Sequence, residues 1–305
     1  MEQNRTTEAR GETVYEEYRP LLFSIAYRMV GSASDAEDIV QEAFLRLHRE
    51  TSKGADIDSP KAWLSTVTTR LSINHVQSAR VRRESYVGTW LPEPLLTDGE
   101  PEGVRNAETA DSLSLAFLVL LETLGPVERA VFLLREVFDY GYDEIAPVVG
   151  RSEENCRQIA VRARRQVETK KPRFEASRKK REELSRRFFA AIAQGDTEGL
   201  IGLLAADVIA YGDGGGKAPA FRRPVYGREK VVRLSLNFGR LAERVRVTDI
   251  RHVEVNGQPG AILMNPEGRP MVVVSLDIAD GLVQTVRAVS NPDKLRHLDS
   301  HADRG

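Results

Sequence analysis

The stretch Gly141–Gln166, GYDEIAPVVGRSEENCRQIAVRARRQ, predicts two short helices joined at a glycine. Gly150 suits the left-handed residue that ends a helix, and Ser152 suits the N-cap of the next one. At about 100° per residue, the apolar side chains of the second helix fall on one face. That face, predicted to be buried, comprises Cys156, Ile159, Ala160, Ala163 and Val167. The pattern favours a helix-turn-helix.

The opposite face of the second helix carries side chains that can form hydrogen bonds with DNA. A helix that enters the major groove needs amide and acidic groups for base edges and arginines for guanine and phosphate. The candidates for contact with duplex DNA are Arg151, Ser152, Glu154, Arg157, Gln158, Arg162 and Arg165. The alternative is an ordinary helical hairpin whose arginines are simply solvated.

Composition and charge restrict the class of protein. The 305 residues predict two or three domains, and a net charge of −1 means that any nucleic-acid surface must be local. Residues 151–187 carry 14 Lys or Arg against 6 Glu, so basic charge is concentrated near the second helix. The single cysteine, Cys156, excludes an intramolecular disulfide and favours a reducing cytoplasm. The start lacks an apolar signal segment, and the most apolar run, Leu113–Leu121, is too short to span a bilayer.

Two further helical patterns precede this region. Residues 1–12 are predicted to be disordered, and an amphipathic helix follows over Tyr15–Val30. The next helix is predicted to begin at Ser34, which with Glu37 has the spacing of a capping box. Its exposed face combines acidic and amide groups with a leucine, which indicates a docking surface for a partner; a solvated helix face is the alternative. The candidate docking residues are Asp38, Gln41, Glu42 and Leu45.

Ser59-Pro60 opens another predicted helix, with proline at its first position. Its predicted core stripe comprises Trp63, Leu64, Val67 and Leu71. Basic and amide side chains accumulate toward its C-terminal end, which suits contact with phosphates and unstacked bases. The candidates for this contact are Trp63, Arg70, Asn74, His75, Arg80, Arg82 and Arg83. The alternative is a helix with cations at its C-terminus, where its dipole favours them.

Residues 87–108 read as a linker by composition, rich in proline, glycine and acids. Within it the motif WLPEP is unusual, because a linker has no need of Trp-Leu between prolines. We interpret WLPEP as an anchor for another surface, with a stiff tether as the alternative; it comprises Trp90, Leu91, Pro92, Glu93 and Pro94. Two strongly apolar helices, broken at Gly125-Pro126, then lead into the helix-turn-helix, and residues 1–170 show no strand pattern.

The sequence pattern changes from purely helical to mixed helical and β near Pro172. A charged helix ending at Gly195 and a short helix over Thr197–Leu204 are followed by β patterns from Asp207 onward. Turn signals such as Asn256-Gly257 and Asp280-Gly281 separate successive antiparallel strands, and a helix around Arg228–Asn237 interrupts them. Helices on a curved antiparallel sheet predict an α+β cone that encloses a pocket.

These residues resemble a known family. DAEDIVQEAF, SPKAWL and the segment from LGPVERAVFLLREVF through the helix-turn-helix resemble an extracytoplasmic-function sigma factor over about residues 12–170. The remainder resembles the SnoaL-like, nuclear-transport-factor-like fold, and WLPEP, DGGGK and NPDKL resemble motifs of the sigma-factor group with this fused extension. The resemblance implies a multidomain chain with two all-α domains followed by an α+β SnoaL-like cone-shaped barrel. The expected domains are sigma region 2 (13–86), the linker (87–108), region 4 (109–171), a regulatory domain (172–298) and a disordered tail (299–305).

The resemblance also implies partners and roles. The helix containing Asp38 would bind the clamp coiled coil of core RNA polymerase, region 4 would contact the flap and the −35 promoter element, and residues 59–83 would melt and recognise the −10 element. Residues 69–75 depart from many relatives, which end this segment with an aspartate, so individual −10 contacts stay open. Such a protein is cytoplasmic, bacterial, not an enzyme, and needs no cofactor or metal; no membrane contact is expected.

Two functions remain open for the C-terminal domain. An enzymatic domain would need convergent titratable groups, for which the candidates are Asp213, Asp249, His252, Glu254 and Asp277. A regulatory domain would use its two motifs to contact the linker or region 2. The residues of those motifs are Asp213, Gly214, Gly215, Gly216, Lys217, Asn291, Pro292, Asp293, Lys294 and Leu295. We favour regulation in cis; the alternative is a helix-turn-helix regulator fused to an active cyclase or isomerase, and a small ligand in the cone is left open.

Overall fold

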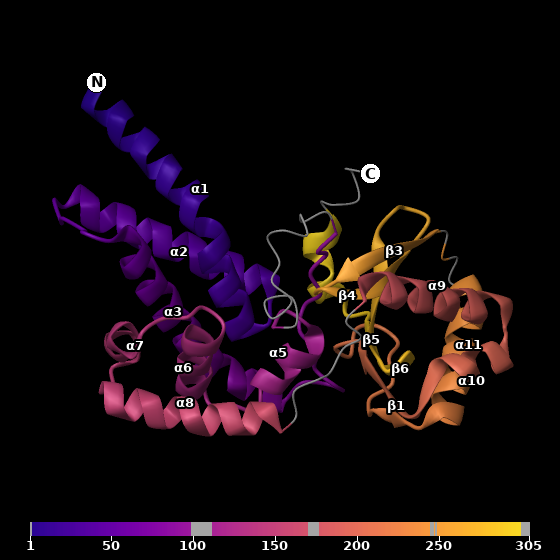
Figure 1. Cartoon of the computed structure of the whole chain (residues 1–305). Coiled ribbons are helices and arrows are strands. Elements are labelled where there is room, and N and C mark those ends of the chain that lie inside the picture. Colours follow the sequence, from indigo (N-terminus) through magenta and orange to yellow (C-terminus); the bar gives the residue numbers. More distant parts are fainter. Residues whose placement is uncertain (1, 99–111, 170–176, 245–246, 248, 300–305) are drawn as a thin grey trace. The chain divides into compact units, whose positions relative to one another are not determined.

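The structure, a computed structural model, describes residues 2–98, 112–169, 177–244, 247 and 249–299, and for residues 2–13, 80–84 and 241–244 it describes the backbone only. The chain forms two compact units (Figure 1). The first comprises Met1–Glu84 and Leu120–Lys171, and the second comprises Ser85–Val119 and Pro172–Gly305. The linker, expected as a separate segment, therefore belongs to the same unit as the C-terminal domain. Among the described residues, no helix combines the length and apolar character needed to cross a membrane.

The first unit begins with three packed helices, α1 (Glu2–Val30), α2 (Ala33–Ser52) and α3 (Pro60–Glu84). The prediction of disorder does not hold for residues 2–12, which continue α1. Once its later turns are nucleated by packing, a helix extends at little cost through residues such as Glu, Arg and Ala. The predicted disordered tail, residues 299–305, lies almost entirely outside the described residues.

Two local predictions in this bundle need correction. The N-cap of α2 is Ser32, whose hydroxyl accepts a hydrogen bond from the Asp35 amide at 3.1 Å; Ser34 lies inside the helix. In α3, Leu64 is buried as predicted, but small hydroxyl side chains share the core face with it, because they allow close helix packing. These buried side chains are Ser65, Thr68, Thr69 and Ser72.

The rest of the first unit is the helix-turn-helix and the helix directly before it, whereas most of the short helix Leu115–Leu121 belongs to the second unit. Helix α5 (Leu115–Leu121) precedes α6 (Pro126–Glu136), α7 (Tyr142–Val149) and α8 (Glu153–Glu168). Gly150 ends α7 with φ 65°, and the Ser152 hydroxyl caps α8 by accepting from the Asn155 amide at 3.3 Å. The five side chains predicted to be buried on α8 are its buried residues, so the predicted face is confirmed.

After Pro172, the described part of the second unit forms one six-stranded sheet and three helices, α9 (Arg178–Gln194), α10 (Thr197–Leu203) and α11 (Arg228–Arg244), which pack together against the sheet (Figure 1). The strand order is β2-β1-β6-β5-β4-β3. The strands are β1 (Leu204–Asp213), β2 (Val225–Tyr226), β3 (Asp249–Val255), β4 (Gln258–Met264), β5 (Pro270–Ala279) and β6 (Leu282–Val289).

The predicted hairpins join β3 to β4 and β5 to β6. Asn256 and Gly257 have φ values of 52° and 74°, and Asp280 and Gly281 have values of 53° and 72°, as type I′ turns require. The sheet is not wholly antiparallel, however, because β1 pairs in parallel with β6. This pairing places the end of β1, where DGGGK begins, beside the end of β6, just before NPDKL and the 3-10 turn η2 (Pro292–Lys294).

Candidate linker-binding site and nucleic-acid interface

The carboxylate of Asp213 binds the linker from a fully buried position at the end of β1. Its Oδ1 accepts hydrogen bonds from the Tyr86 hydroxyl at 2.5 Å and from the Gly215 amide at 3.1 Å. Its Oδ2 accepts from the Leu91 amide at 2.8 Å and from the Lys294 ammonium at 2.7 Å. Asp213 thus joins DGGGK, NPDKL and the linker at one point.

Lys294 approaches the same linker residue from the C-terminal side. Its ammonium also donates to the carbonyl of Leu91, and it lies 4.4 Å from the ring centroid of Trp90 and 5.0 Å from that of Tyr86. Cations placed over aromatic faces in this way are attracted by the ring quadrupole. Burial, and secondly the hydrogen bond to Asp213, raise the pKa of the Tyr86 hydroxyl, so this group stays protonated as a donor at neutral pH.

The glycines of DGGGK allow the chain to pass close to the other two motifs. Gly215 has φ 58°, and a Cβ there would lie 2.3 Å from the Asn291 side-chain nitrogen and 3.0 Å from the Tyr86 hydroxyl oxygen. The same Asn291 amide donates to the Tyr86 hydroxyl at 2.9 Å. At the rim, Lys217 and Asp293 form an exposed ion pair between the two motifs. We call the set Asp213, Gly215, Asn291 and Lys294 the linker-binding site.

The second half of WLPEP is also buried against the C-terminal segment. Glu93 is 7% exposed, and its carboxylate lies 3.8 Å from Nδ1 of His297. Nε2 of His297 lies 2.8 Å from the carbonyl oxygen of Pro94, within hydrogen-bond distance. All five WLPEP residues therefore lie against this unit: Leu91 to Pro94 are buried, and Trp90 is half-buried.

Residues Leu95–Asp98 then pair with the edge of the sheet next to β3. The Thr97 amide donates to the Glu254 carbonyl at 2.9 Å, and the Asn256 amide donates to the Leu95 carbonyl at 2.8 Å. The side-chain oxygen of Asn256 accepts from the Leu95 amide at 2.9 Å. This short edge segment covers part of a row of backbone groups that the edge strand would otherwise present to solvent.

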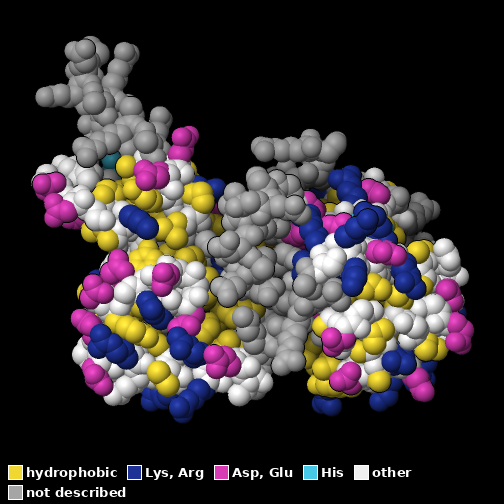
Figure 2. All heavy atoms as spheres, in the orientation of Figure 1, with side chains coloured by type: hydrophobic (Ala, Val, Ile, Leu, Met, Phe, Trp, Pro, Cys, Tyr) yellow, Lys and Arg dark blue, Asp and Glu magenta, His cyan; other side chains and the backbone are white. Residues whose placement is uncertain are grey.

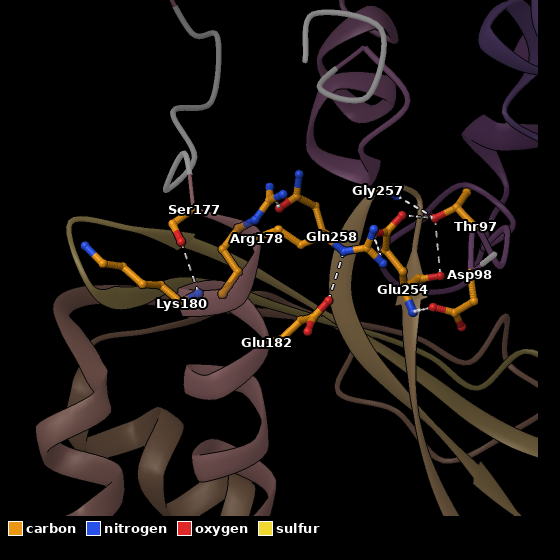
Figure 3. A network of polar contacts seen from close by, with 10 residues as sticks. Thr97, Asp98, Ser177, Arg178, Lys180, Glu182, Glu254, Gly257 and Gln258 are labelled. Atoms are coloured by element: carbon orange, nitrogen blue, oxygen red, sulfur yellow. Dashed lines mark hydrogen bonds and ion pairs between the residues drawn. The ribbon is translucent and has the colours of Figure 1, made fainter. Parts of the chain in front are cut away.

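Side chains reinforce the edge segment, as Figure 3 shows. The Thr97 hydroxyl donates to Oε1 of Glu254 at 2.7 Å and accepts from the Gly257 amide at 3.0 Å. Oε2 of Glu254 lies 3.4 Å from the guanidinium of Arg178, which also pairs with Glu182 at 2.9 Å. Helix α9 is thereby connected to the linker through a buried carboxylate.

The predicted −35 face lies on the surface of the first unit. All seven candidates on and just before α8 are exposed, and Figure 2 shows basic side chains with acidic ones between them along the edge where α8 runs. Arg157 pairs with Glu153 at 2.9 Å, and Gln158 contacts Glu154 at 3.4 Å. The same face carries Val161, 46% exposed, which sequence analysis did not select; an apolar group here can contact a thymine methyl.

The predicted docking face of α2 is also on the surface. Asp38 and Gln41 are exposed, and Leu45, at 51%, is among the most exposed large apolar side chains described. Glu42 pairs with Arg46 at 2.7 Å, and this hydrogen bond lowers the pKa of the Glu42 carboxyl. The exposure of these residues is compatible with a partner surface and equally with a solvated helix face.

The candidates for the −10 element on α3 have different surroundings. Asn74 is exposed, Trp63 is half-buried, and His75 lies 3.3 Å from the carboxylate of Asp35. The guanidinium of Arg70 donates to the carbonyls of Pro147 and Val148, at 2.7 and 3.1 Å, and so binds the end of α7. The side chains of Arg80, Arg82 and Arg83 lie outside the described residues. In this arrangement Arg70 is engaged with the helix-turn-helix.

The five candidates for acid–base chemistry do not meet at one point. Only His252 and Glu254 line the same small pocket beside α9, where the Glu254 carboxylate already binds Thr97 and Arg178. Asp213 and Glu254 bind the linker, Asp277 pairs with Arg287, and Asp249 pairs with Arg251 at the surface. None of the five, including His252, is among the residues that line the large cavity of this unit. Within the described residues, no group of His, Cys, Asp and Glu is arranged to bind a metal ion.

Sequence analysis missed several residues of the site, notably Tyr86, Thr97, Asn256 and His297. Tyr86 precedes the expected linker boundary at residue 87, and Thr97 follows the motif WLPEP. Asn256 was assigned only to a turn. Leu95-Leu96-Thr97 is too short and not alternating, so the sequence carried no strand signal for the edge segment.

Comparisons with known proteins agree with this architecture. Residues 14–82 match the family described as Sigma-70 region 2, and residues 114–167 match Sigma-70, region 4. The ECF RNA polymerase sigma factor SigJ of Mycobacterium tuberculosis is 38% identical, covering 92% of this chain and 91% of its own length. The probable ECF RNA polymerase sigma factor SigI of the same species is 32% identical, covering 92% and 93%.

The crystal structure of M. tuberculosis SigJ is similar to this one with a TM-score of 0.71 and 35% identity, covering 92% of this chain and 96% of that one. The similarity therefore extends beyond the two helical regions into the C-terminal α+β domain. The chain belongs to the extracytoplasmic-function (ECF) family of RNA polymerase sigma factors, and it is an alternative sigma factor that acts with core RNA polymerase in transcription initiation at promoter DNA.

Proposed function

We propose that the C-terminal domain controls this sigma factor in cis by binding the linker between regions 2 and 4. The observation that carries the proposal is the buried carboxylate of Asp213, which accepts hydrogen bonds from Tyr86, directly before the linker, and from Leu91 within it. Burying a charged group is costly unless it is paired and hydrogen-bonded, so the linker completes a site that would be unfavourable without it. Linker capture and folding of the domain are therefore expected to be coupled.

Linker capture matters because the two DNA-binding regions act at separate promoter elements. We infer that the exposed face of α2, centred on Leu45, contacts the clamp coiled coil of polymerase, and that α8 contacts the −35 element. Region 4 would also contact the flap, and residues 59–83 would recognise the −10 element. When one DNA-binding region is bound to its promoter element, the linker sets the effective concentration of the other region near its own element. The free length of the linker therefore changes the affinity of the sigma factor for the promoter without changing any DNA contact.

The alternative function, an active cyclase or isomerase, has weaker support. A general acid–base pair must lie within hydrogen-bond reach of its substrate. The candidate carboxylates of this domain bind the linker or arginines outside the cavity lining. Regulation in cis explains the same buried carboxylates as structural parts of the linker contact.

The test is promoter-specific transcription with purified core polymerase. We would compare the full chain, a chain ending at Lys171, and one ending before Asn291. The last lacks Lys294 and His297 but keeps all six strands of the sheet. If the domain acts through the linker, removing the final segment changes the transcript yield and makes the 86–98 region sensitive to protease. Equal yields and equal protease resistance for the three chains would contradict control in cis.

A further inference from the structure

The second unit contains a large cavity that the linker does not occupy. It lies between the sheet and helices α9 and α11, and its volume is about 920 Å³. This is at the upper end of the range of roughly 300–1,000 Å³ found for small-molecule sites. Small residues of the sheet, Ala210, Gly212 and Ala288, form part of its wall, opposite the aromatic rings of Phe188 and Phe238.

The cavity wall is apolar and nearly uncharged. Among the described residues that line it there is no Asp, Glu, Lys or His, and the one arginine, Arg240, is exposed. A charged ligand inside would lose its hydration without gaining a counter-ion, which is strongly unfavourable. Ser235 and Asn237 can each offer a hydrogen bond to a neutral polar group. The chemistry therefore selects a neutral, mainly apolar ligand.

We propose that this cavity is a binding site for a neutral, ring-containing apolar molecule. A ligand that enters an apolar cavity of this size removes apolar surface from water and gains dispersion contacts with the side chains around it. The aromatic lining favours ligand rings over flexible chains, since offset-stacked and edge-to-face contacts add to the burial of apolar area. Ile250, 42% exposed, lies at the lining and extends the apolar surface toward solvent.

The cavity shares its wall with the linker-binding site. Gly212 and Ser290 line the cavity, and they immediately precede Asp213 and Asn291. The Ser290 hydroxyl donates to the carbonyl of Pro219 at 3.2 Å and so connects the loop after DGGGK to the end of β6. Phe221, in the same loop, packs so closely on Gly212 that a Cβ at residue 212 would lie 2.8 Å from its ring. A ligand that contacts Phe221 therefore acts on the loop that carries the linker contacts.

Binding is tested on the full chain with N-phenyl-1-naphthylamine, a neutral dye whose emission rises in apolar sites. We expect one site, and at least about a tenfold weaker affinity in Ala288→Phe and in Leu234→Trp, which fill the cavity from opposite walls. Ala206→Phe, on an exposed position of β1, is the matched control and should bind the dye as the parent chain does.

Three results would overturn the site: no saturable dye binding by the parent chain, unchanged binding in either filled variant that retains its folded circular dichroism, or stronger binding of a fatty-acid anion than of the dye. The third would show that the ligand is a charged chain. Two filled variants are used because one of them could be destabilised by overpacking.

A second measurement tests the connection to the linker, and it rests on the proposed control in cis. Asp213→Asn should weaken dye binding several-fold, because the loop carrying Phe221 loses its anchor, whereas Asp249→Asn at the surface should not. Release of the linker is followed separately by Trp90 emission. If Asp213→Asn releases the linker but binds the dye with unchanged affinity, the cavity and the linker-binding site are not coupled, although the cavity still binds the dye. If the linker stays bound in Asp213→Asn, the role proposed for Asp213 is wrong.

Discussion

Lys294 and Asp213 form an ion pair of 2.7 Å in which both side chains are buried and both also bind the backbone of Leu91. The Leu91 amide donates to the carboxylate, and the Leu91 carbonyl accepts from the ammonium. One peptide segment of the linker therefore satisfies both ends of a buried charge pair. This relationship explains why DGGGK and NPDKL, 81 residues apart at these positions, act as a single site.

Replacing Lys294 by Met should release the linker. The variant keeps the length of the side chain but leaves the Asp213 carboxylate buried without its counter-ion, which typically costs about 3–5 kcal/mol. We would measure urea unfolding and the emission of Trp90 in a Trp63→Phe background. Lys217→Met is the matched control, because its ion pair with Asp293 is exposed and such pairs contribute about 1 kcal/mol or less. Equal losses of stability in the two variants would contradict the assigned role of Lys294.

Thr97→Val should detach the edge segment from β3. Valine has the shape of threonine but cannot donate to Glu254 or accept from the Gly257 amide, and an unsatisfied buried polar group costs about 1–3 kcal/mol. Hydrogen exchange should accelerate at the amides of Thr97 and Asn256, which form the backbone pairing. Thr169→Val, at the exposed end of α8, serves as the control and should leave both amides protected. Unchanged exchange in Thr97→Val would show that backbone pairing alone binds the segment.

Local signals in the sequence predicted the helix-turn-helix well. Gly150 and Ser152 act within their own turns, so their roles follow from backbone sterics and capping without knowledge of the rest of the fold. The same holds for the turns at Asn256 and Asp280, whose positive φ values their residue types favour. In each case the residues that decide the conformation are neighbours in the chain.

The linker contacts could not be predicted from periodicity. The Leu91 amide and the Asp213 carboxylate are 122 residues apart, and no local pattern determines that they meet. Resemblance to a family singled out the three motifs, but not the hydrogen bonds between them, nor Tyr86, which lies outside all three. The parallel pairing of β1 with β6 was missed for the same reason, since it depends on how the whole sheet is assembled.

The stability of the second unit should decrease as the pH falls below about 6.5, the ordinary pKa of histidine. Partial burial of the ring against Phe189, and then the nearby Arg186 cation, lower the pKa of His252, although the residue keeps an exposed side, which limits the size of the effect. The unfolded chain therefore binds a proton at a pH where folded His252 does not, so its contribution to stability is complete above that pH and is lost toward the folded pKa.

His252→Gln should flatten this pH dependence, measured as urea midpoints between pH 7.5 and pH 5, roughly the interval in which histidines titrate. His48→Gln, at an exposed position of α2, is the control, because it removes a histidine from the first unit and leaves the second unit unchanged. If the urea midpoint of His252→Gln changes with pH as steeply as that of the parent chain, other groups determine the pH dependence.

On α8, Arg162 should matter more for promoter recognition than Arg164, although both are arginines of the same helix. Arg162 is exposed on the face that also carries Gln158 and Val161, whereas the Arg164 guanidinium makes two hydrogen bonds to Glu136, at 2.6 and 3.1 Å. A good bidentate arginine contact with a base contributes about 1–3 kcal/mol of discrimination, so Arg162→Ala should reduce transcription from the cognate promoter about 5- to 150-fold. It should also narrow the difference in transcript yield between that promoter and one with an altered −35 element.

The control is Arg164→Ala, which should leave this difference in transcript yield intact. Binding to core polymerase should stay constant in both variants. If Arg162→Ala discriminates normally and Arg164→Ala does not, the DNA-facing side of α8 has been assigned to the wrong face, because the two side chains project from the helix in different directions.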